Sequence, residues 1–327
     1  MNSIIKVLLV TTALAAMPAQ ASEPTPVLKG ITHQALFDLS FDGGNGVAVG
    51  AGGQIVVSRD SGKSWTPEKS PSPLSLLGVA RRGSRVVAVG QMGLVLLRDS
   101  AGQWKQVKTA TTERLMAIDM NSRGQAVAVG SFGTVLRSGD GGASWTAAKP
   151  DWASMFAADS ATLGDNFQPH LYAVDVAENG SVVIAGELST ILRSADGAAT
   201  WDVISRGISS QERVDPSLFG MDIREDGVGF AVGQSGVLLK TTDAGLSWSA
   251  LTSGTRAILL GIDSGTDGQV LVTGMREMLR SRDDGASWQH VKGSNISTAW
   301  YSAAVRPAGS STVLAAGQQG TILAISR

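Results

Sequence analysis

A short apolar motif that ends in glycine recurs along the chain, and it constrains the fold more than any other feature of the sequence. Its seven copies occupy residues 47–50, 87–90, 127–130, 183–186, 231–233, 272–274 and 314–317. Successive final glycines lie 40, 40, 56, 47, 41 and 43 residues apart, so two of the intervals carry insertions. A fixed period of about 42 residues is typical of propellers and other repeat folds, in which each unit is one small supersecondary structure.

Each unit contains four stretches with the pattern of a short strand. In the third unit these are residues 115–118, 127–130 and 134–137 and the stretch that begins at Trp145. One such sheet leaves both faces in water, whereas seven sheets in a ring pack face to face. We therefore predict an all-β fold, a seven-bladed β-propeller with four-stranded blades. The 40 glycines among 327 residues, about 12% against an average of about 7%, agree with the many tight turns of such a fold.

The last unit lacks a fourth strand. It reaches Arg327 soon after its third strand at residues 321–324, without the tryptophan that begins the fourth strand in other units. Residues 25–29, Thr-Pro-Val-Leu-Lys, resemble the end of the first blade at residues 65–69, Trp-Thr-Pro-Glu-Lys. We predict that the N-terminal strand closes the last blade.

The first residues have the pattern of an export signal. Lys6 precedes an apolar run at residues 7–16, and residues 18–21, Pro-Ala-Gln-Ala, form a site that signal peptidase accepts. We expect a signal peptide at residues 1–21, a propeller domain at residues 22–327, and an exported protein that is periplasmic or secreted. No apolar run reaches the roughly twenty residues that a membrane-spanning helix needs, so no integral membrane segment is expected in the mature chain.

Charge and composition argue against several classes of ligand. Lys and Arg number 27 against 28 Asp and Glu, so no basic surface field favours nucleic acid. There is no cysteine, and the three histidines are scattered, so no metal site is predicted. The glycine-rich turns lack the Lys-Ser/Thr ending of a phosphate-binding loop, and no cofactor is expected.

A second motif, here called the Asp–Trp motif, lies between the third and fourth strands. Its aspartate and tryptophan pairs are Asp60 and Trp65, Asp140 and Trp145, Asp196 and Trp201, Asp243 and Trp248, and Asp283 and Trp288. It resembles the Asp box of bacterial neuraminidase repeats. The aspartate can accept turn N–H groups, glycine permits positive φ, and the tryptophan covers the hairpin. We interpret the motif as a folding element rather than as a site of chemistry.

Together with the Val-Gly-x-x-Gly sequence before the Asp–Trp motif, the repeats resemble those of the photosystem II stability and assembly factor family over the whole of residues 22–327. This family consists of seven-bladed propellers and has relatives in non-photosynthetic bacteria, so the chain is identified as a bacterial member. The resemblance implies an auxiliary protein without catalytic activity. It implies a protein partner and a role as a scaffold or assembly factor for a membrane complex of the cell envelope.

The neuraminidase-like motif also raises an alternative, a carbohydrate-active propeller such as a glycosidase or sialidase. Glu187 follows a repeat glycine where the other blades carry no acid, and Asp151, Asp159 or Asp165 of the 149–168 insertion could act as its partner. A glycosidase needs two such carboxylates, and a sialidase uses a tyrosine nucleophile. The chain has only two tyrosines, Tyr172 and Tyr301, at first-strand positions that favour packing.

Basic residues recur eight positions before the tryptophan of four blades: Arg137, Arg193, Lys240 and Arg280. In the assembly-factor family an arginine patch is associated with partner binding, so this basic row is one candidate contact surface. An aspartate stands eleven residues before the repeat glycine in the same four blades: Asp119, Asp175, Asp222 and Asp263. Because acid and base occur together, we favour ion pairs between the two rows and keep partner binding as the alternative.

Large apolar residues occur at the end of the predicted blades that lies opposite the Asp–Trp motifs. The six candidates for partner binding are Met92, Phe132, Trp152, Phe156, Leu188 and Met275. Exposed together, they would form a protein interface. In the other interpretation, the 149–168 insertion folds over and buries them. The sequence leaves both interpretations open.

Overall fold

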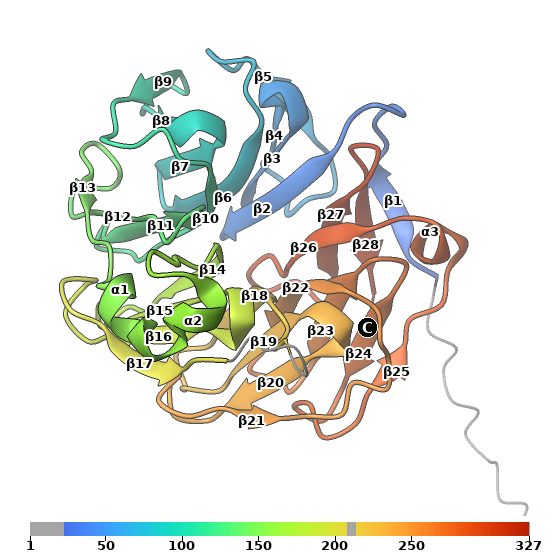
Figure 1. Ribbon diagram of the computed structural model, residues 1–327. Helices are drawn as coiled ribbons and strands as arrows, with labels where there is room; N and C mark the ends of the chain where they lie inside the picture. Colours follow the sequence, from blue (N-terminus) through green and yellow to red (C-terminus); the bar gives the residue numbers. More distant parts are fainter. Residues whose placement is uncertain (1–22, 208–213, 327) are drawn as a thin grey trace, which may run out of the picture.

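The computed structural model describes residues 23–207 and 214–326, so the predicted signal peptide at residues 1–21 lies outside the described residues. Seven four-stranded antiparallel sheets stand around a central axis, as Figure 1 shows. The innermost strand of each sheet contacts the innermost strands of its two neighbours, and the last sheet contacts the first. The predicted seven-bladed propeller is therefore confirmed.

The blades are numbered along the chain, each from its innermost strand outward. Blade one comprises β2 (Leu36–Asp42), β3 (Asn45–Gly50), β4 (Ile55–Ser58) and β5 (Thr66–Glu68), and blade two comprises β6 (Leu76–Arg82), β7 (Arg85–Gly90), β8 (Val95–Arg98) and β9 (Trp104–Val107). Blade three comprises β10 (Leu115–Met120), β11 (Ala126–Gly130), β12 (Val135–Ser138) and β13 (Thr146–Ala147), and blade four comprises β14 (Leu171–Val176), β15 (Val182–Gly186), β16 (Ile191–Ser194) and β17 (Asp202–Ser205). Blade five comprises β18 (Leu218–Ile223), β19 (Gly229–Gly233), β20 (Leu238–Thr241) and β21 (Ser249–Ala250), and blade six comprises β22 (Leu259–Ser264), β23 (Val270–Gly274), β24 (Met278–Ser281) and β25 (Gln289–His290). Blade seven comprises β26 (Tyr301–Val305), β27 (Val313–Gly317), β28 (Ile322–Ile325) and β1 (Thr25–Leu28).

The N-terminal strand closes the last blade, as predicted. Strand β1 pairs with β28 in antiparallel register, with Thr25 opposite Ala324 and Leu28 opposite Ile322. The two strands lie side by side in Figure 1 although they come from opposite ends of the chain. Because β1 covers what would be an open strand edge, the ring has no unfinished blade.

The hydrophobic core lies between blades rather than inside any one of them. Val47 and Val49 of blade one pack in one cluster with Leu76 and Val86 of blade two, and similar clusters join the other neighbours. A strand that is covered on both faces needs apolar residues at successive positions instead of alternating ones. This is why the repeated motif is a continuous apolar run.

The glycine that ends each motif is required by a close approach of backbone. A Cβ atom added at Gly50 would collide with the carbonyl oxygen of Ala35, and one added at Gly130 would collide with that of Arg114. In both cases the colliding atom belongs to the residue that enters the innermost strand of the same blade. The glycine spacing thus reports the point where the second strand meets the start of the first.

Three short helices lie in the links between blades. They are α1 (Trp152–Met155), α2 (Ser160–Leu163) and α3 (Ser294–Ser297). The first two belong to the 149–168 insertion and cover the edge of blade four in Figure 1. Over residues 23–207 and 214–326, no helix has the length and apolar character to cross a membrane.

The Asp–Trp motif makes the local contacts expected of a folding element. Asp60 accepts the backbone N–H of Ser64 at 2.9 Å and the Ser64 hydroxyl at 2.6 Å. Gly62 has a φ of 82°. The indole of Trp65 donates to the carbonyl of Gly62 at 3.1 Å. The same carboxylate contacts recur at Asp140, Asp196, Asp243 and Asp283.

Candidate functional site

The innermost strands enclose a central channel with a volume of about 730 Å³. Each of these strands contains a β-bulge one residue after its start. In six blades the bulged residue is large and mainly apolar, and all six line the channel: Phe37, Leu77, Met116, Tyr172, Phe219 and Leu260. Blade seven has Ser302 at this place. These six residues, here called the collar, surround one mouth of the channel.

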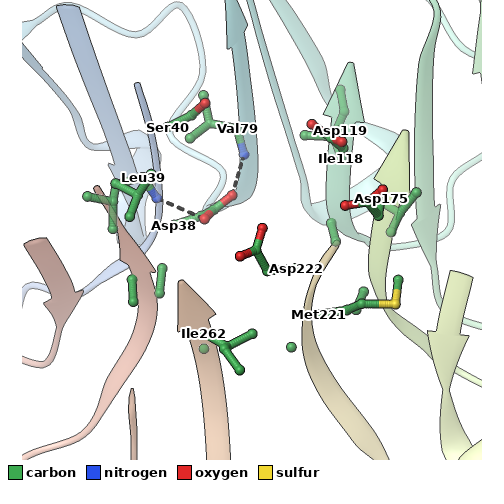
Figure 2. Close-up of a pocket in the computed structure, with 18 of the residues that line it drawn as sticks. Asp38, Leu39, Ser40, Val79, Ile118, Asp119, Asp175, Met221, Asp222 and Ile262 are labelled. Atoms are coloured by element: carbon green, nitrogen blue, oxygen red, sulfur yellow. Dashed lines mark hydrogen bonds between the residues drawn. The ribbon is translucent and has the colours of Figure 1, made fainter. Parts of the chain in front are cut away.

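Four aspartates line the channel beyond the collar: Asp38, Asp119, Asp175 and Asp222. Together with Asp263, which occupies the position of Asp119 in blade six, they are here called the channel aspartates. Figure 2 shows the first four of them around the channel, and one carboxylate oxygen of Asp38 accepts the backbone N–H of Val79 at 2.8 Å.

Each of the other four channel aspartates also bonds to the next blade. The accepted backbone N–H groups belong to Val176 (2.8 Å), Ile223 (3.1 Å), Ser264 (2.6 Å) and Arg306 (2.7 Å). An innermost strand has one edge without a strand partner, and these carboxylates satisfy N–H groups on that edge. The channel aspartates therefore join neighbouring blades.

Burial raises the pKa of these carboxyls. It raises the pKa of Asp38 and of Asp263 to about 7. Burial, and then the negative charges of Asp119 and Asp222, hold the pKa of Asp175 well above its usual range. The channel thus holds carboxylates that are short of water and that repel one another.

Two arginines offset part of this negative charge. Arg82 pairs with Asp119 at 3.3 Å, and Arg306 pairs with Asp263 at 3.4 Å and with Asp267 at 3.0 Å. The remaining acids that line the channel are Asp42, Glu178 and Glu225, and no other Lys or Arg lines it among the described residues. The lining is therefore strongly acidic.

The basic row does not pair with the channel aspartates, and the favoured interpretation of the sequence is wrong on this point. Among the described residues, no ion pair joins Arg137, Arg193, Lys240 or Arg280 to any of them. Asp119 lies opposite Val127, and Val127 lies opposite Arg137, so a whole strand separates acid from base. The two backbones are therefore about 10 Å apart.

The basic heads instead contact the following blade. Lys240 donates to the carbonyl of Asp284 at 2.6 Å and to its carboxylate at 3.2 Å, within the Asp–Trp turn of blade six. Arg193 donates to the carbonyl of Ala244 at 3.2 Å, and Arg280 to that of Ser326 at 2.8 Å. Arg137 lines a cavity beside the Asp–Trp turn of blade four. Three of the four basic residues thus join blades along the ring.

The six apolar residues proposed for partner binding divide into two groups. Met92, Phe132 and Met275 have exposed fractions of 68%, 54% and 45%. Trp152, Phe156 and Leu188 are buried. Trp152 and Phe156 pack in the cluster between blades three and four, and the Trp152 indole donates to the carbonyl of Gly133 at 2.9 Å. The fold of the insertion thus covers Trp152 and Phe156, and Leu188 is buried in the turn after β15, so these three side chains are not on the surface.

Three of the four acids proposed for the glycosidase alternative, Glu187, Asp151 and Asp159, have structural contacts. Glu187 accepts the backbone N–H of His170 at 2.8 Å. Asp151 caps α1 by accepting the N–H of Ser154 at 3.2 Å, and Asp159 pairs with Arg206 at 2.9 Å.

Neither tyrosine has a lowered pKa. Burial raises the pKa of Tyr301 to about 12. Burial, and then the negative charge of Glu187 and a hydrogen bond with it, raise the pKa of Tyr172 to about 12 as well. A lowered pKa is one way in which a nucleophile is activated, and neither tyrosine shows it.

Sequence reasoning missed the collar and two polar residues of blade one. Asp38 was not singled out, and Ser40 accepts the N–H of Arg81 at 3.0 Å in the place where later blades use an aspartate. A signal was present, because the buried residue that begins each innermost strand is followed by a large apolar residue in six blades. Two successive apolar residues are also what a strand buried on both faces requires, so the pattern alone does not distinguish collar residues from core residues.

Comparisons with known proteins agree with the fold. The sequence profile of the photosynthesis system II assembly factor YCF48 family matches residues 154–326. A solved structure described as YCF48 bound to D1 peptide superposes with a TM-score of 0.70 at 19% identity, covering 96% of this chain and 100% of that one. YCF48 from Cyanidioschyzon merolae gives a TM-score of 0.71 at 18% identity, covering 93% and 99%.

A more distant propeller has the same architecture. The WD40 propeller domain of Doa1 superposes with a TM-score of 0.66 at 13% identity, covering 94% of this chain and 98% of that one. No curated protein matches the sequence. At these identities the superpositions show a shared fold, whereas the profile match spans more than half of the chain. The chain therefore belongs to the photosynthesis system II assembly factor YCF48 family.

Proposed function

We propose that this protein is an exported, non-catalytic propeller that binds a protein partner and acts as a scaffold or assembly factor for a complex of the cell envelope. Family membership supports an auxiliary role, and a solved relative is described as bound to a peptide. The signal-peptide pattern at residues 1–21 supports export. Glu187 accepts the backbone N–H of His170, and this structural contact supports a non-catalytic role for it.

One observation carries the proposal: two exposed apolar side chains stand on adjacent blades in a backbone conformation that disfavours them. Met92 and Phe132 have φ values of 56° and 51°, a conformation that costs a non-glycine residue roughly 1–2 kcal/mol. The same turn position has positive φ in every blade, with Gly52 in blade one and Leu188, Ser235, Arg276 and Gln319 in blades four to seven, so the turn itself requires this conformation. Met92 and Phe132 differ from these residues in being both large, apolar and exposed, and exposed aromatic and Met side chains are typical of interfaces.

The proposal is tested by capturing partners with the full tagged protein. The test variant carries Met92→Asn and Phe132→Asn, because Asn tolerates positive φ and removes only the apolar group. The control is Leu246→Asn, which replaces an apolar side chain of comparable exposure. Leu246 lies in the Asp–Trp turn of blade five, at the opposite end of the propeller from Met92 and Phe132. The wild type, the double variant and the control are each incubated with a detergent extract of envelope membranes, and bound proteins are identified by mass spectrometry.

We expect the wild type and the control to enrich the subunits of one complex and the double variant to lose most of them. The melting temperature of the double variant should not fall, because the two side chains are exposed and the substitutions relieve backbone strain. Equal capture by all three proteins would contradict the assigned surface. Failure of the wild type to enrich any complex would contradict the proposed function itself.

A further inference from the structure

The charge of the channel aspartates is not needed for their structural task. In blade one the neutral hydroxyl of Ser40 accepts the N–H of Arg81 at 3.0 Å, as Asp119 accepts that of Val176 in blade three. Both residues lie at the same register position, opposite the first valine of the repeat motif. A neutral acceptor therefore joins blades as well as a carboxylate does.

Three of these carboxylates also lack a cationic partner. Arg82 and Arg306 pair with Asp119 and Asp263, whereas no ion pair to Asp38, Asp175 or Asp222 is found in the described part of the chain. Like charges held together in a partly desolvated space repel each other and destabilise the fold. Serine at these positions would join the blades without this repulsion, yet the chain has aspartates there. The retained negative charge points to a positively charged ligand.

The surroundings of these carboxylates restrict what that ligand is. The collar puts six large side chains around the mouth, with Tyr172 and Phe219 in edge-to-face contact at 5.0 Å between ring centroids. The channel volume of about 730 Å³ lies within the usual range for sites that bind small molecules or short chain segments. The described acids do not form a group suited to hold a metal ion. An apolar collar above acidic walls matches a basic side chain whose neighbours are apolar.

We propose that the channel receives a lysine or arginine side chain from an extended segment of the protein partner, with apolar residues of that segment resting on the collar. This inference rests on the proposed function and assigns part of the partner contact to the channel. The basic head would sit among Asp38, Asp175 and Asp222, the carboxylates without an ion pair. The exposed residues Met92 and Phe132 lie at the ends of strands on the same face and would contact flanking parts of the partner.

The first test measures binding of short peptides to the full protein by fluorescence polarisation. The probe is Gly-Phe-Leu-Lys-Leu-Phe-Gly-amide with a neutral dye on its N-terminus, and its matched forms carry norleucine or glutamate in place of the lysine. At about pH 8, above the pKa of about 7 of Asp38, and at low salt, the lysine peptide should bind about tenfold more tightly than the norleucine peptide. The glutamate peptide should bind most weakly. Equal affinity for all three peptides, or no binding by any, would overturn the proposal.

The second test removes charge from the channel and keeps the acceptor atoms. In the double variant Asp175→Asn and Asp222→Asn, an amide oxygen can still accept the N–H groups of Ile223 and Ser264. We expect the preference for lysine over norleucine to fall about tenfold, with an unchanged or higher melting temperature. The control Asp202→Asn makes the same change on an exposed outer strand and should leave the preference intact.

These results separate a binding role from a structural one. A structural role alone predicts a lower melting temperature and an unchanged peptide preference in the double variant, and that combination would overturn the proposal. Partner capture from envelope extracts tests the channel proposal separately from the proposed scaffold function. If the wild type captures a complex and the double variant captures it equally well, the channel proposal is wrong while the proposed function stands.

Discussion

At the scale of single residues, the channel aspartates combine two opposing effects. Each stabilises the ring by satisfying a backbone N–H of the next blade, and each loses hydration by doing so. The Asp–Trp aspartates have the opposite environment, because hydrogen bonds from neighbouring hydroxyl and N–H groups hold the pKa of Asp60, Asp243 and Asp283 at about 2. The two sets of carboxyls therefore respond to different ranges of pH.

These shifts predict a stability maximum in weakly acidic solution. Asp38 and Asp263 have a pKa of about 7 in the folded chain, above the ordinary value of 3.8, so folding is weakened as pH rises from about 4 to about 7. For the Asp–Trp aspartates the pKa is depressed, so their contribution is lost as pH falls from about 4 to about 2. Urea unfolding should give a higher midpoint near pH 4.5 than near pH 8.

The variant Asp38→Asn identifies the source of this dependence. It should raise the free energy of unfolding at about pH 8 by about 1–2 kcal/mol, allowing for the water in the channel, and change it little at about pH 4. The same stability for variant and wild type at the higher pH would contradict the assignment to Asp38.

At the scale of elements, strand β1 determines whether the ring is complete. It pairs with β28 and covers the apolar side of blade seven through Val27 and Leu28, which pack against the cluster shared with blade one. Without β1, β28 becomes an open edge next to the first blade. Such an edge invites pairing with another chain.

Removal of residues 23–29 should therefore lower the melting temperature by about 10 °C or more and promote association. Light scattering with differential scanning calorimetry measures both effects. A synthetic peptide of residues 23–30 added in excess should restore part of the lost stability, since it can bind the same edge. A truncated protein that stays monomeric and melts like the wild type would show that β1 is dispensable.

Comparing elements also shows how far the sequence could lead. The repeat glycines predicted the blade number and the closing strand because both depend on spacing and on apolar continuity. Counting back eleven residues from each repeat glycine did not compare equivalent residues of the innermost strands, because the first hairpin of blade one is a residue shorter than that of blade three. Asp119 therefore corresponds to Ser40 and not to Leu39. A register difference of one residue is invisible until the hairpin is built.

The surface residues were harder to predict for a different reason. Whether Trp152 and Phe156 face water depends on how the 149–168 insertion folds back on blades three and four. A pattern of apolar residues in a loop does not contain that information. For Phe132 and Met92 the sequence left both exposure and burial open; both are exposed, whereas Leu188 at the same turn position is buried.

At the scale of the whole molecule, the position of the core determines how the protein unfolds. Since the main clusters contain residues of two neighbouring blades, no blade holds a complete core of its own. Open repeat arrays can lose terminal units one at a time, but a closed ring has no terminal unit. The blades should therefore unfold together.

We expect one transition in urea, with the same midpoint by tryptophan fluorescence and by circular dichroism. The variant Val129→Ala, in the core between blades three and four, should shift both curves equally by about 1–3 kcal/mol of unfolding free energy. Two separate transitions, or a shift seen by one probe alone, would mean that the blades are independent.

The pairing of β1 with β28 also sets the order of events during biosynthesis. Strand β1 precedes β28 in the chain, so β1 has no partner until β28 has been synthesised, and the ring cannot close before then. A chain that terminates before β28 has an unpaired β1 and an exposed strand edge, and proteases and chaperones recognise such exposed segments. The same joint that stabilises the finished protein thus distinguishes it from every incomplete version of itself.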